Sequence, residues 1–283
     1  MSTLVSVWGA ARDRLRAAGV DSPVLDARLL LEAGAGVTRT DIVTDPQRVL
    51  SETQIAGVDA LVTRREAREP ISHIVGSKAF WTIELACGPN VLTPRPETEL
   101  VVEVGLEHLR FAEPVRVLDL GVGSGAILLA LLSVRPLATG VGLDASPEAL
   151  SIARQNAQAL GLSDRTAWIE GDWAKAEGVF DFIASNPPYI RSGAISLLEP
   201  EVANYEPLLA LDGGVDGLDA YRAIAPLLPA LLAEDGLWAF EIGEGQAEAV
   251  WALTDAVGLR PEGVRRDLAG RPRVVWGRKR LSS

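Results

Sequence analysis

The sequence predicts a doubly wound α/β fold with an antiparallel edge, preceded by a small helical region. From residue 115 onward, apolar runs of strand length alternate with segments of helical periodicity. A glycine-rich turn follows the first of these runs, where an open parallel sheet joins its first helix. Residues 3–67 instead repeat apolar residues at helical spacing. These observations predict a helical domain followed by a parallel-sheet domain.

The N-terminal region is predicted to contain several helices. Val5, Trp8, Ala11 and Leu15 follow helical spacing, and Asp21-Ser22-Pro23 is typical of a helix start. A short helical turn is expected near Ile42, and another helix from Ser51 to Ala67. Because these segments carry no catalytic pattern, we interpret residues 1–70 as a recognition domain.

A β-hairpin is predicted next, as a linker over residues 71–93. Its expected strands are 71–77 and 78–85, with Gly76 in the turn. A helix is then expected to begin near Thr93 and run to about Leu109, because acidic residues favour a helix N-terminus.

The remaining segment, 94–283, is predicted to hold the sheet. An apolar run such as 115–120 is typical of a buried parallel strand. The other predicted strands are 140–144, 167–172, 182–185 and 237–242, the helices are 126–132, 149–160 and 246–257, and a closing hairpin joins 264–268 to 274–277.

Composition excludes several classes of protein. No apolar run reaches the ~18 residues that a membrane span needs, and the N-terminus lacks the basic region of a signal peptide. Cys87 is the single cysteine, so an intramolecular disulfide or a cysteine zinc site is excluded. No carboxylates stand at metal-ligand spacing either. We therefore expect a cytoplasmic protein without a metal.

The net charge of −11 argues against affinity gained by neutralising DNA phosphates. Residues 1–90 hold ten Lys/Arg and eleven Asp/Glu, so nearly all of the net charge lies in the rest of the chain. The front end suits an acidic or RNA-rich partner, although an ordinary solvated surface explains the same residues.

The stretch Asn186-Pro187-Pro188-Tyr189 closes a predicted strand and suits a planar NH2 group. The nitrogen of an amide is a poor nucleophile because its lone pair is delocalised. The Asn186 oxygen and the Pro187 carbonyl are candidate acceptors for the two N–H bonds, and the prolines fix the backbone. The Tyr189 ring can lie flat against such a group. The simpler interpretation is a proline-stiffened turn.

A cofactor site is predicted at the preceding strand ends. Gly121, Gly123 and Gly125 form a turn more compact than the usual dinucleotide pattern, and Asp144 follows at a distance that suits ribose hydroxyls. Asp172 can accept an adenine amino group, and Trp173 can pack on the ring. Helix capping is the alternative for both aspartates. Together with Asn186, these features indicate S-adenosyl-L-methionine.

The chain resembles the protein-(glutamine-N5) methyltransferase family, in particular the enzymes that act on peptide chain release factors. The resemblance covers nearly the whole chain and is most specific where the Pro-Arg-Pro-Glu-Thr-Glu and Tyr-Glu-Pro segments occur together. The segments that carry it are Arg68-Glu69-Pro70-Ile71, Pro94-Arg95-Pro96-Glu97-Thr98-Glu99, Asp119 to Gly125, Asn186 to Ile190, Tyr205-Glu206-Pro207 and Glu241-Ile242-Gly243.

This resemblance implies a Rossmann-like class I methyltransferase sheet and a helical domain that helps to hold the release factor. It implies that the glutamine of a Gly-Gly-Gln loop is methylated. We expect a monomer with no direct DNA or membrane partner. The site residues expected for the cofactor are Gly121, Val122, Gly123, Ser124, Gly125, Asp144, Asp172, Trp173 and Asn186. Those expected for the glutamine are Asn186, Pro187, Pro188, Tyr189 and Arg95. Val122 departs from the hydroxyl residue that many relatives carry.

We expect direct in-line transfer without a covalent intermediate, with Asn186, Pro187 and Tyr189 as the catalytic residues. Arg95 is equally consistent with contact to the substrate and with an ion pair to Glu97 or Glu99. The segments 205–207 and 212–214 form either a partial lid or a plain loop.

Three other functions fit parts of the sequence. A glutamine methyltransferase of a ribosomal protein would carry a similar catalytic half. A DNA adenine methyltransferase would use the same four residues, but it should add a basic groove and a target-recognition domain. A non-catalytic translation-binding module would retain only the fold.

Overall fold

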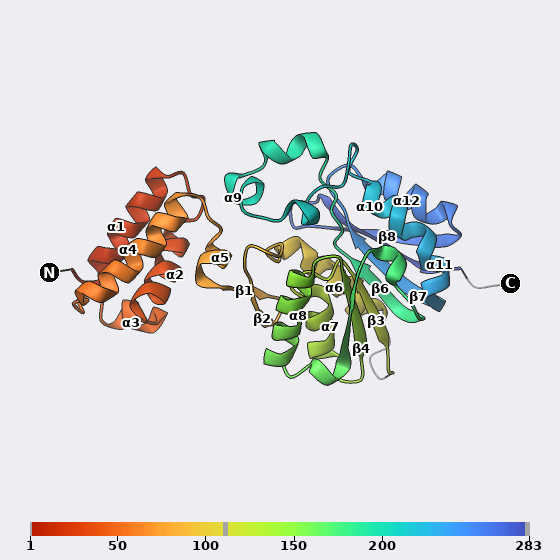
Figure 1. The fold of residues 1–283 in the computed structure, drawn as a ribbon, viewed down its shortest axis with the longest axis horizontal. Helices are drawn as coiled ribbons and strands as arrows, with labels where there is room; N and C mark the ends of the chain where they lie inside the picture. Colours follow the sequence, from red (N-terminus) through yellow and green to blue (C-terminus); the bar gives the residue numbers. More distant parts are fainter. Residues whose placement is uncertain (1, 110–112, 281–283) are drawn as a thin grey trace. The chain divides into compact units, whose positions relative to one another are not determined.

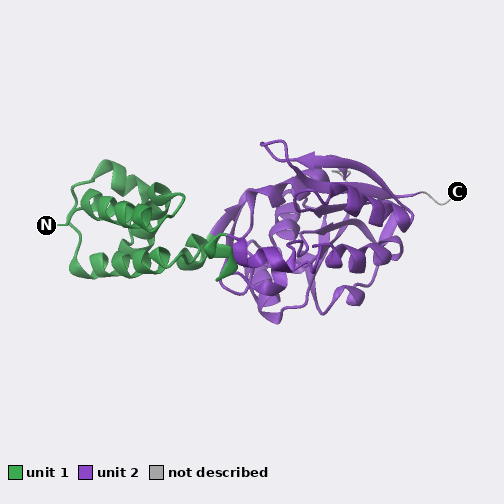
Figure 2. Ribbon diagram, turned by 90° about the horizontal axis from the view of Figure 1, so that it is seen from above, with its two compact units in different colours: residues 1–77, 199–205 green, residues 78–198, 206–283 purple. Residues whose placement is uncertain are grey.

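The computed structural model describes residues 2–109 and 113–280 and divides into two compact units (Figure 2). The first unit comprises Met1–Ser77 together with Glu199–Tyr205. The second comprises Lys78–Leu198 and Glu206–Ser283. The predicted domains at 1–70, 71–93 and 94–283 do not anticipate that a segment from the second half of the chain belongs to the helical unit.

The first unit is helical, as predicted. Threonine and serine caps start three of its helices. In each, the cap side chain accepts from the backbone N–H of the third helical residue, whose side chain accepts from the backbone N–H of the cap. Gly34 and Gly57 let two helices approach closely, because a Cβ at Gly34 would lie 2.7 Å from the Val58 backbone. Leu4, Leu15, Leu30, Leu31, Val58 and Val62 are among the buried core residues. The helices are α1 (Leu4–Ala17), α2 (Pro23–Ala35), α3 (Arg39–Thr44), α4 (Glu52–Glu66) and α5 (Ile71–Val75).

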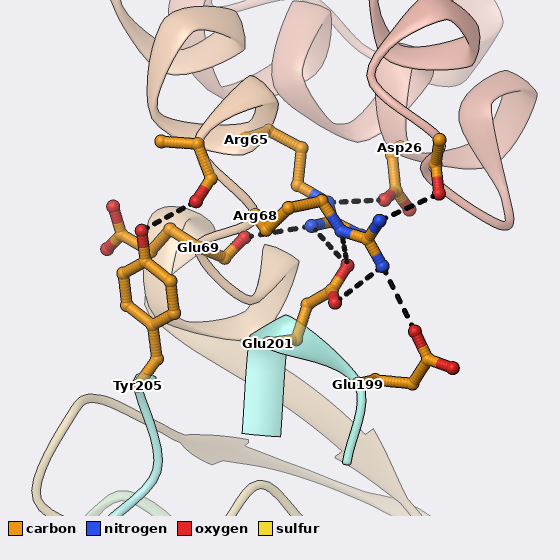
Figure 3. A network of polar contacts seen from close by, with 9 residues as sticks. Asp26, Arg65, Arg68, Glu69, Glu199, Glu201 and Tyr205 are labelled. Atoms are coloured by element: carbon orange, nitrogen blue, oxygen red, sulfur yellow. Dashed lines mark hydrogen bonds and ion pairs between the residues drawn. The ribbon is translucent and has the colours of Figure 1, made fainter. Parts of the chain in front are cut away.

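The segment 199–205, which contains helix α9 (Pro200–Ala203), is fixed to this unit by ion pairs (Figure 3). Arg65 is buried and lies 2.8 Å from both Asp26 and Glu201. Arg68 donates through two nitrogens to Glu201, at 2.6 and 2.7 Å. The Tyr205 hydroxyl donates to the backbone carbonyl of residue 67 at 2.7 Å.

The second unit contains a seven-stranded sheet with the order β5-β4-β3-β6-β7-β9-β8. Its strands β3, β4, β6 and β7 are labelled in Figure 1. The five strands from β5 to β7 are parallel, and β9 is antiparallel to both of its neighbours. This confirms the doubly wound sheet with an antiparallel edge. The strands are β3 (Arg116–Leu120), β4 (Thr139–Asp144), β5 (Thr166–Glu170), β6 (Phe180–Ser185), β7 (Leu232–Glu241), β8 (Leu259–Arg266) and β9 (Pro272–Lys279).

Helices cover both faces of the sheet, because successive side chains of a strand point to opposite sides. Val117 packs with α6 (Glu99–His108), α7 (Ala126–Val134) and α8 (Pro147–Ala159). Leu118 packs with the opposite layer, formed by α10 (Asp219–Ile224), α11 (Leu228–Leu231) and α12 (Ala247–Ala256). Short 3-10 helices fill the connections: η1 (Pro96–Thr98), η2 (Ser163–Arg165), η3 (Trp173–Lys175), η4 (Ser192–Leu197), η5 (Leu208–Ala210) and η6 (Ala225–Leu227).

The structure differs from the sequence predictions in three places. The helix expected to begin near Thr93 starts only with η1 at Pro96 and continues as α6 from Glu99. The predicted strand over 71–77 is largely the helix α5, whose first turn is formed when the Pro70 carbonyl accepts from two backbone amides, and which ends at Gly76 in a left-handed conformation. The hairpin instead pairs β1 (Ser77–Phe80) with β2 (Ile83–Ala86). The helices α10 and α11 were not predicted, because α10 has only six residues and because Pro226 and Pro229 interrupt the apolar run that contains α11.

No helix within the described residues combines the length and the apolarity needed to cross a membrane.

Candidate functional site

A cavity of about 790 Å³ opens at the carboxyl ends of the parallel strands in the second unit. Its volume is typical of small-molecule sites, and its place is where open α/β sheets bind ligands. Four successive strand ends contribute to it. The contributing residues are Gly121 to Ser124 after β3, Asp144 to Ser146 after β4, Gly171 to Trp173 after β5, and Asn186 and Pro188 after β6.

The glycine turn is held by hydrogen bonds from both sides. The backbone amides of Gly121 and Val122 donate to the carbonyl of residue 143 at 2.8 and 3.0 Å. Asn156 of α8 donates to the Ser124 carbonyl at 2.9 Å. Val122 is 4% exposed and belongs to the apolar core, so a hydroxyl is not needed to hold the turn. Gly125 does not line the cavity; it precedes α7 in a left-handed conformation.

The Asp144 carboxylate lies beside this turn. Its Oδ2 accepts from the Gly123 amide and its Oδ1 from the Ser146 amide, both at 2.9 Å. Burial raises its pKa, and these amides offset part of the rise. A carboxylate offers about four acceptor positions, so two remain for hydroxyl groups of a ligand. Asp144 can therefore cap the backbone amides and still accept hydrogen bonds from ribose hydroxyls.

The next strand end holds Asp172 and Trp173, which both line the cavity. Asp172 is exposed and accepts from the Ala174 amide at 3.2 Å, which is a cap of η3. A Cβ at Gly121 would lie 3.2 Å from the Trp173 ring, so the indole covers the glycine turn.

Asp119 is a cavity residue that was not predicted as part of the site. It is 1% exposed, and its Oδ2 accepts from the Leu128 amide at 3.2 Å. Its Oδ1 has no hydrogen-bond partner within residues 2–109 and 113–280. Burial raises its pKa to about 7. The sequence signal was an acidic residue two positions before the first glycine of the turn.

Asn186 lines the cavity and is linked to two buried residues that were also missed. Its Nδ2 donates to the Thr98 hydroxyl at 3.1 Å, and Thr98 donates to Glu241 at 2.6 Å. Because Nδ2 is engaged, the carboxamide oxygen is the end that can meet a ligand. Both Thr98 and Glu241 belong to segments that carry the family resemblance. Neither stands at a sequence distance from other polar residues that is typical of a catalytic motif.

The other residues of the Asn-Pro-Pro-Tyr motif differ in whether they line the cavity. Pro188 lines the cavity, whereas Pro187 is buried and Tyr189 is not among the lining residues. The Tyr189 ring packs against the core, and its hydroxyl donates to Glu241 at 3.0 Å. The hydroxyl of the ring is thus held by Glu241, and stacking of the ring face on a substrate stays a prediction.

Arg95 also lies outside the cavity lining. It forms an ion pair with the buried Glu206 at 2.8 Å rather than with Glu97 or Glu99. Burial raises the pKa of Glu206, and the Arg95 charge opposes this rise. Glu99 instead accepts from the Trp81 amide at 2.8 Å.

The two segments expected to form a partial lid contribute cavity residues. Pro207 and the η5 residues Leu208 and Leu209 line the cavity, and both leucines are more than half exposed. Asp212 and Gly214 line it as well, with the Asp212 carboxylate accepting from Ser192 and Gly214. Tyr205 belongs to the helical unit.

Two further predictions concern metal and thiol chemistry. Among the described residues, no group of three or more His, Cys, Asp and Glu side chains is arranged to hold a metal ion. Burial raises the pKa of the Cys87 thiol to about 11, so a reactive thiolate is disfavoured at neutral pH.

Comparison with known proteins identifies both halves of the chain. Residues 7–76 match the PrmC N-terminal domain, and residues 99–201 match the methyltransferase small domain. A release factor glutamine methyltransferase of Caulobacter vibrioides is 54% identical and covers 98% of this chain and 96% of its own. The enzyme of the same name from Rhodospirillum rubrum is 48% identical, over 95% of this chain and 83% of its own.

The chain belongs to the release factor glutamine methyltransferase family. Among solved structures, a methyltransferase from Pyrococcus furiosus matches 72% of this chain and 92% of its own, with a TM-score of 0.54 and 16% identity. That likeness supports the class I methyltransferase fold alone.

The cavity of this glutamine methyltransferase family member fits S-adenosyl-L-methionine, the methyl donor of the fold. The buried, unpartnered oxygen of Asp119 suits the ammonium of the methionine part. Asp144 has acceptor positions for the ribose hydroxyls, and Trp173 offers an apolar surface for a planar ring. We propose that these three residues bind the cofactor, together with the backbone of Gly121 to Ser124.

Asp119→Asn is expected to stabilise the free protein at pH 8 while weakening cofactor binding. Because the folded-state pKa lies above the ordinary value of 3.8, folded Asp119 binds its proton more tightly. Its contribution to stability therefore falls as the pH rises from about 4 to about 7. The variant avoids this loss, so we expect a gain of about 1–3 kcal/mol at pH 8 and little difference at pH 4, where the loss has scarcely begun.

The measurements are urea denaturation at both pH values and calorimetric titration with S-adenosyl-L-methionine. Loss of a charged partner should raise the Kd by about 10-fold to 100-fold. Asp164→Asn, which changes an exposed aspartate, is the matched control. Unchanged cofactor affinity in Asp119→Asn would contradict the assignment.

Proposed function

We propose that this chain methylates the side-chain amide nitrogen of the glutamine in the Gly-Gly-Gln motif of peptide chain release factors. The observation that carries the proposal is the Asn186 carboxamide at the cavity, with its Nδ2 held by Thr98 and its oxygen left for a substrate N–H. The names of the curated relatives support the same substrate.

The cofactor supplies a methyl group that is already activated by a positively charged sulfur. The protein must therefore orient the acceptor and exclude water, rather than generate a strong nucleophile. We propose that the Asn186 oxygen accepts one N–H of the glutamine amide and that the Pro187 carbonyl accepts the other. The lone pair of the nitrogen is then turned toward the methyl. The proton can leave after transfer, because the methylated nitrogen is far more acidic.

Other parts of the proposal concern the rest of the chain. The helical domain at 1–70 would bind the body of the release factor, and 94–283 would be the methyltransferase domain, with 71–93 as the connection. We propose a cytoplasmic monomer that does not bind DNA directly. Contact of Arg95 with the substrate is not part of this proposal, because its guanidinium is paired with Glu206.

The test is an acceptor panel with cofactor labelled in the methyl group. The wild-type protein is incubated separately with purified release factors, ribosomal proteins and DNA, and labelled peptides are sequenced by mass spectrometry. We expect label on the glutamine of the Gly-Gly-Gln motif alone. Label on a ribosomal protein or on DNA would assign the activity to one of the other methyltransferases. Cofactor binding without any labelled acceptor would favour a non-catalytic binding module.

A further inference from the structure

The direction in which the Asn186 carboxamide points determines what it can recognise. Its two ends are nearly equal in size, but the oxygen accepts hydrogen bonds and the NH2 donates them. If the oxygen faces the cavity, it binds an N–H of a substrate amide. If the NH2 faces the cavity, it suits a carboxylate. The contacts behind the carboxamide must therefore select one of two orientations.

The hydroxyl of Thr98 makes this selection through its single proton. Thr98 is 3% exposed, and its hydroxyl lies 2.6 Å from Glu241 Oε2 and 3.1 Å from Asn186 Nδ2. An ionised carboxylate only accepts hydrogen bonds, so the hydroxyl proton must be donated to Glu241. The hydroxyl oxygen is then an acceptor toward Asn186 and can pair only with the NH2 end of the carboxamide.

Glu241 is itself held in place at the end of β7. It is 2% exposed, and its Oε1 accepts from the Tyr189 hydroxyl at 3.0 Å. Its backbone carbonyl accepts from the Tyr221 hydroxyl of α10 at 2.7 Å. The hydroxyls of Thr98 and Tyr189 therefore both donate to the Glu241 carboxylate. While this carboxylate is ionised it has no proton to donate, so Thr98 cannot reverse its hydrogen bond.

The protonation state of Glu241 sets the condition for this arrangement. Burial raises its pKa to about 7, the hydroxyls of Thr98 and Tyr189 lower it, and the charges of Glu97 and Arg273 act in opposite directions. Experiments at pH 8 therefore examine the ionised form.

We propose that Thr98 and Glu241 are positioning residues that turn the Asn186 oxygen toward the cavity and so make the site select a glutamine amide over a glutamate carboxylate. This inference rests on the proposed function, because it assumes a glutamine side chain at Asn186. A glutamate carboxylate in the same place would face the Asn186 oxygen, which is also an acceptor. Neither oxygen would then receive a hydrogen bond, and burying two such acceptors is unfavourable.

The decisive variant is Thr98→Val, which keeps the shape of the side chain and removes its hydroxyl. We expect kcat at pH 8 to fall by about 10-fold to 100-fold, with cofactor affinity changing by less than about 3-fold. Freed from Thr98, the carboxamide can rotate and present its NH2. Binding of a Gly-Gly-Glu peptide should therefore improve relative to a Gly-Gly-Gln peptide, measured by calorimetry with the demethylated cofactor present.

Two control variants separate positioning from folding. Thr98→Ser restores the hydroxyl and should recover most of the lost turnover and the preference for glutamine. Thr254→Val makes the same chemical change at another buried threonine, whose hydroxyl bonds only to backbone carbonyls within and near α12. It should change stability without changing the preference for glutamine.

A double-mutant cycle tests whether Thr98 acts through Asn186. In an Asn186→Ala background, Thr98→Val should lower kcat by less than about 2-fold, because the group that Thr98 orients is absent. An equally large effect in both backgrounds, or an unchanged preference for glutamine in Thr98→Val, overturns the inference.

A measurement on the wild-type protein covers the case in which Thr98→Val does not fold. The side-chain amide signals of Asn186, identified by their loss in Asn186→Ala, should show slow exchange with solvent at pH 8. Fast exchange or free rotation of this carboxamide overturns the inference as well. Failure of the proposed function is distinct, since it appears as an unlabelled release factor in the wild-type reaction.

Discussion

Asn186→Ala should lower kcat on release factor by about 100-fold to 1,000-fold, the usual loss when one preorganised hydrogen-bonding group is removed from an active site. The substrate nitrogen loses the acceptor that turns its lone pair toward the methyl. Cofactor affinity should fall by less than about 10-fold, because Asp119 and Asp144 still line the cavity. Single-turnover kinetics and calorimetric titration separate the two effects.

The control for this variant is Asn204→Ala, which removes an exposed carboxamide from the segment in the helical unit. It should leave both kcat and cofactor affinity close to the wild-type values. Near-normal turnover of release factor by Asn186→Ala would show that the carboxamide does not hold the reacting nitrogen.

Arg65→Ala should destabilise the helical unit by about 3–5 kcal/mol, the usual cost of removing one partner of a buried ion pair. Arg65 and Asp26 are 6% and 4% exposed, and the Arg65 guanidinium contacts both Asp26 and Glu201. Without Arg65, the Asp26 carboxylate is left buried beside an apolar core. The free energy of unfolding is measured by urea denaturation followed by far-ultraviolet circular dichroism.

Arg64→Ala is the matched control, because the neighbouring arginine has a 45% exposed side chain and pairs with Glu69. An exposed pair of this kind contributes about 0–1 kcal/mol. Replacing both buried partners, with Arg65→Met and Asp26→Leu, should recover much of the loss, since no unpaired carboxylate then remains. If Arg64→Ala and Arg65→Ala lowered the free energy of unfolding equally, the larger contribution that we attribute to the buried ion pair would be wrong.

The sequence predicted those parts of the site that depend on strand ends. Gly121, Asp144, Trp173 and Asn186 follow four successive apolar runs, and parallel strands bring their carboxyl ends to one edge of a sheet. Local periodicity and short motifs were therefore sufficient to place these residues at one cavity. The helices α1 to α4 of the first unit were predicted for the same reason, since helical spacing is local.

Sequence patterns failed where the partner of a side chain is distant in the chain. They did not reveal that Glu241 holds the Tyr189 hydroxyl, and Arg95 pairs with Glu206 rather than with a nearby acid. The strand expected at 71–77 was wrong for a local reason, because backbone amides three and four residues away donate to the Pro70 carbonyl and Gly76 ends the resulting helical turn. Neither hydrophobic periodicity nor motif spacing reports such contacts.

By itself, the sequence determined that a methyl-transfer cavity lies at the ends of parallel strands. Glycine, aspartate and asparagine follow buried apolar strands, and these strands run in the same direction, so the residues after them meet at one edge of the sheet. Only the tertiary structure decided how the cavity residues are oriented. Thr98, Asn186 and Glu241 come from three distant segments, and their hydrogen bonds exist only after the chain has folded. The direction of a carboxamide depends on which donor and acceptor stand behind it, and a linear pattern does not contain that information.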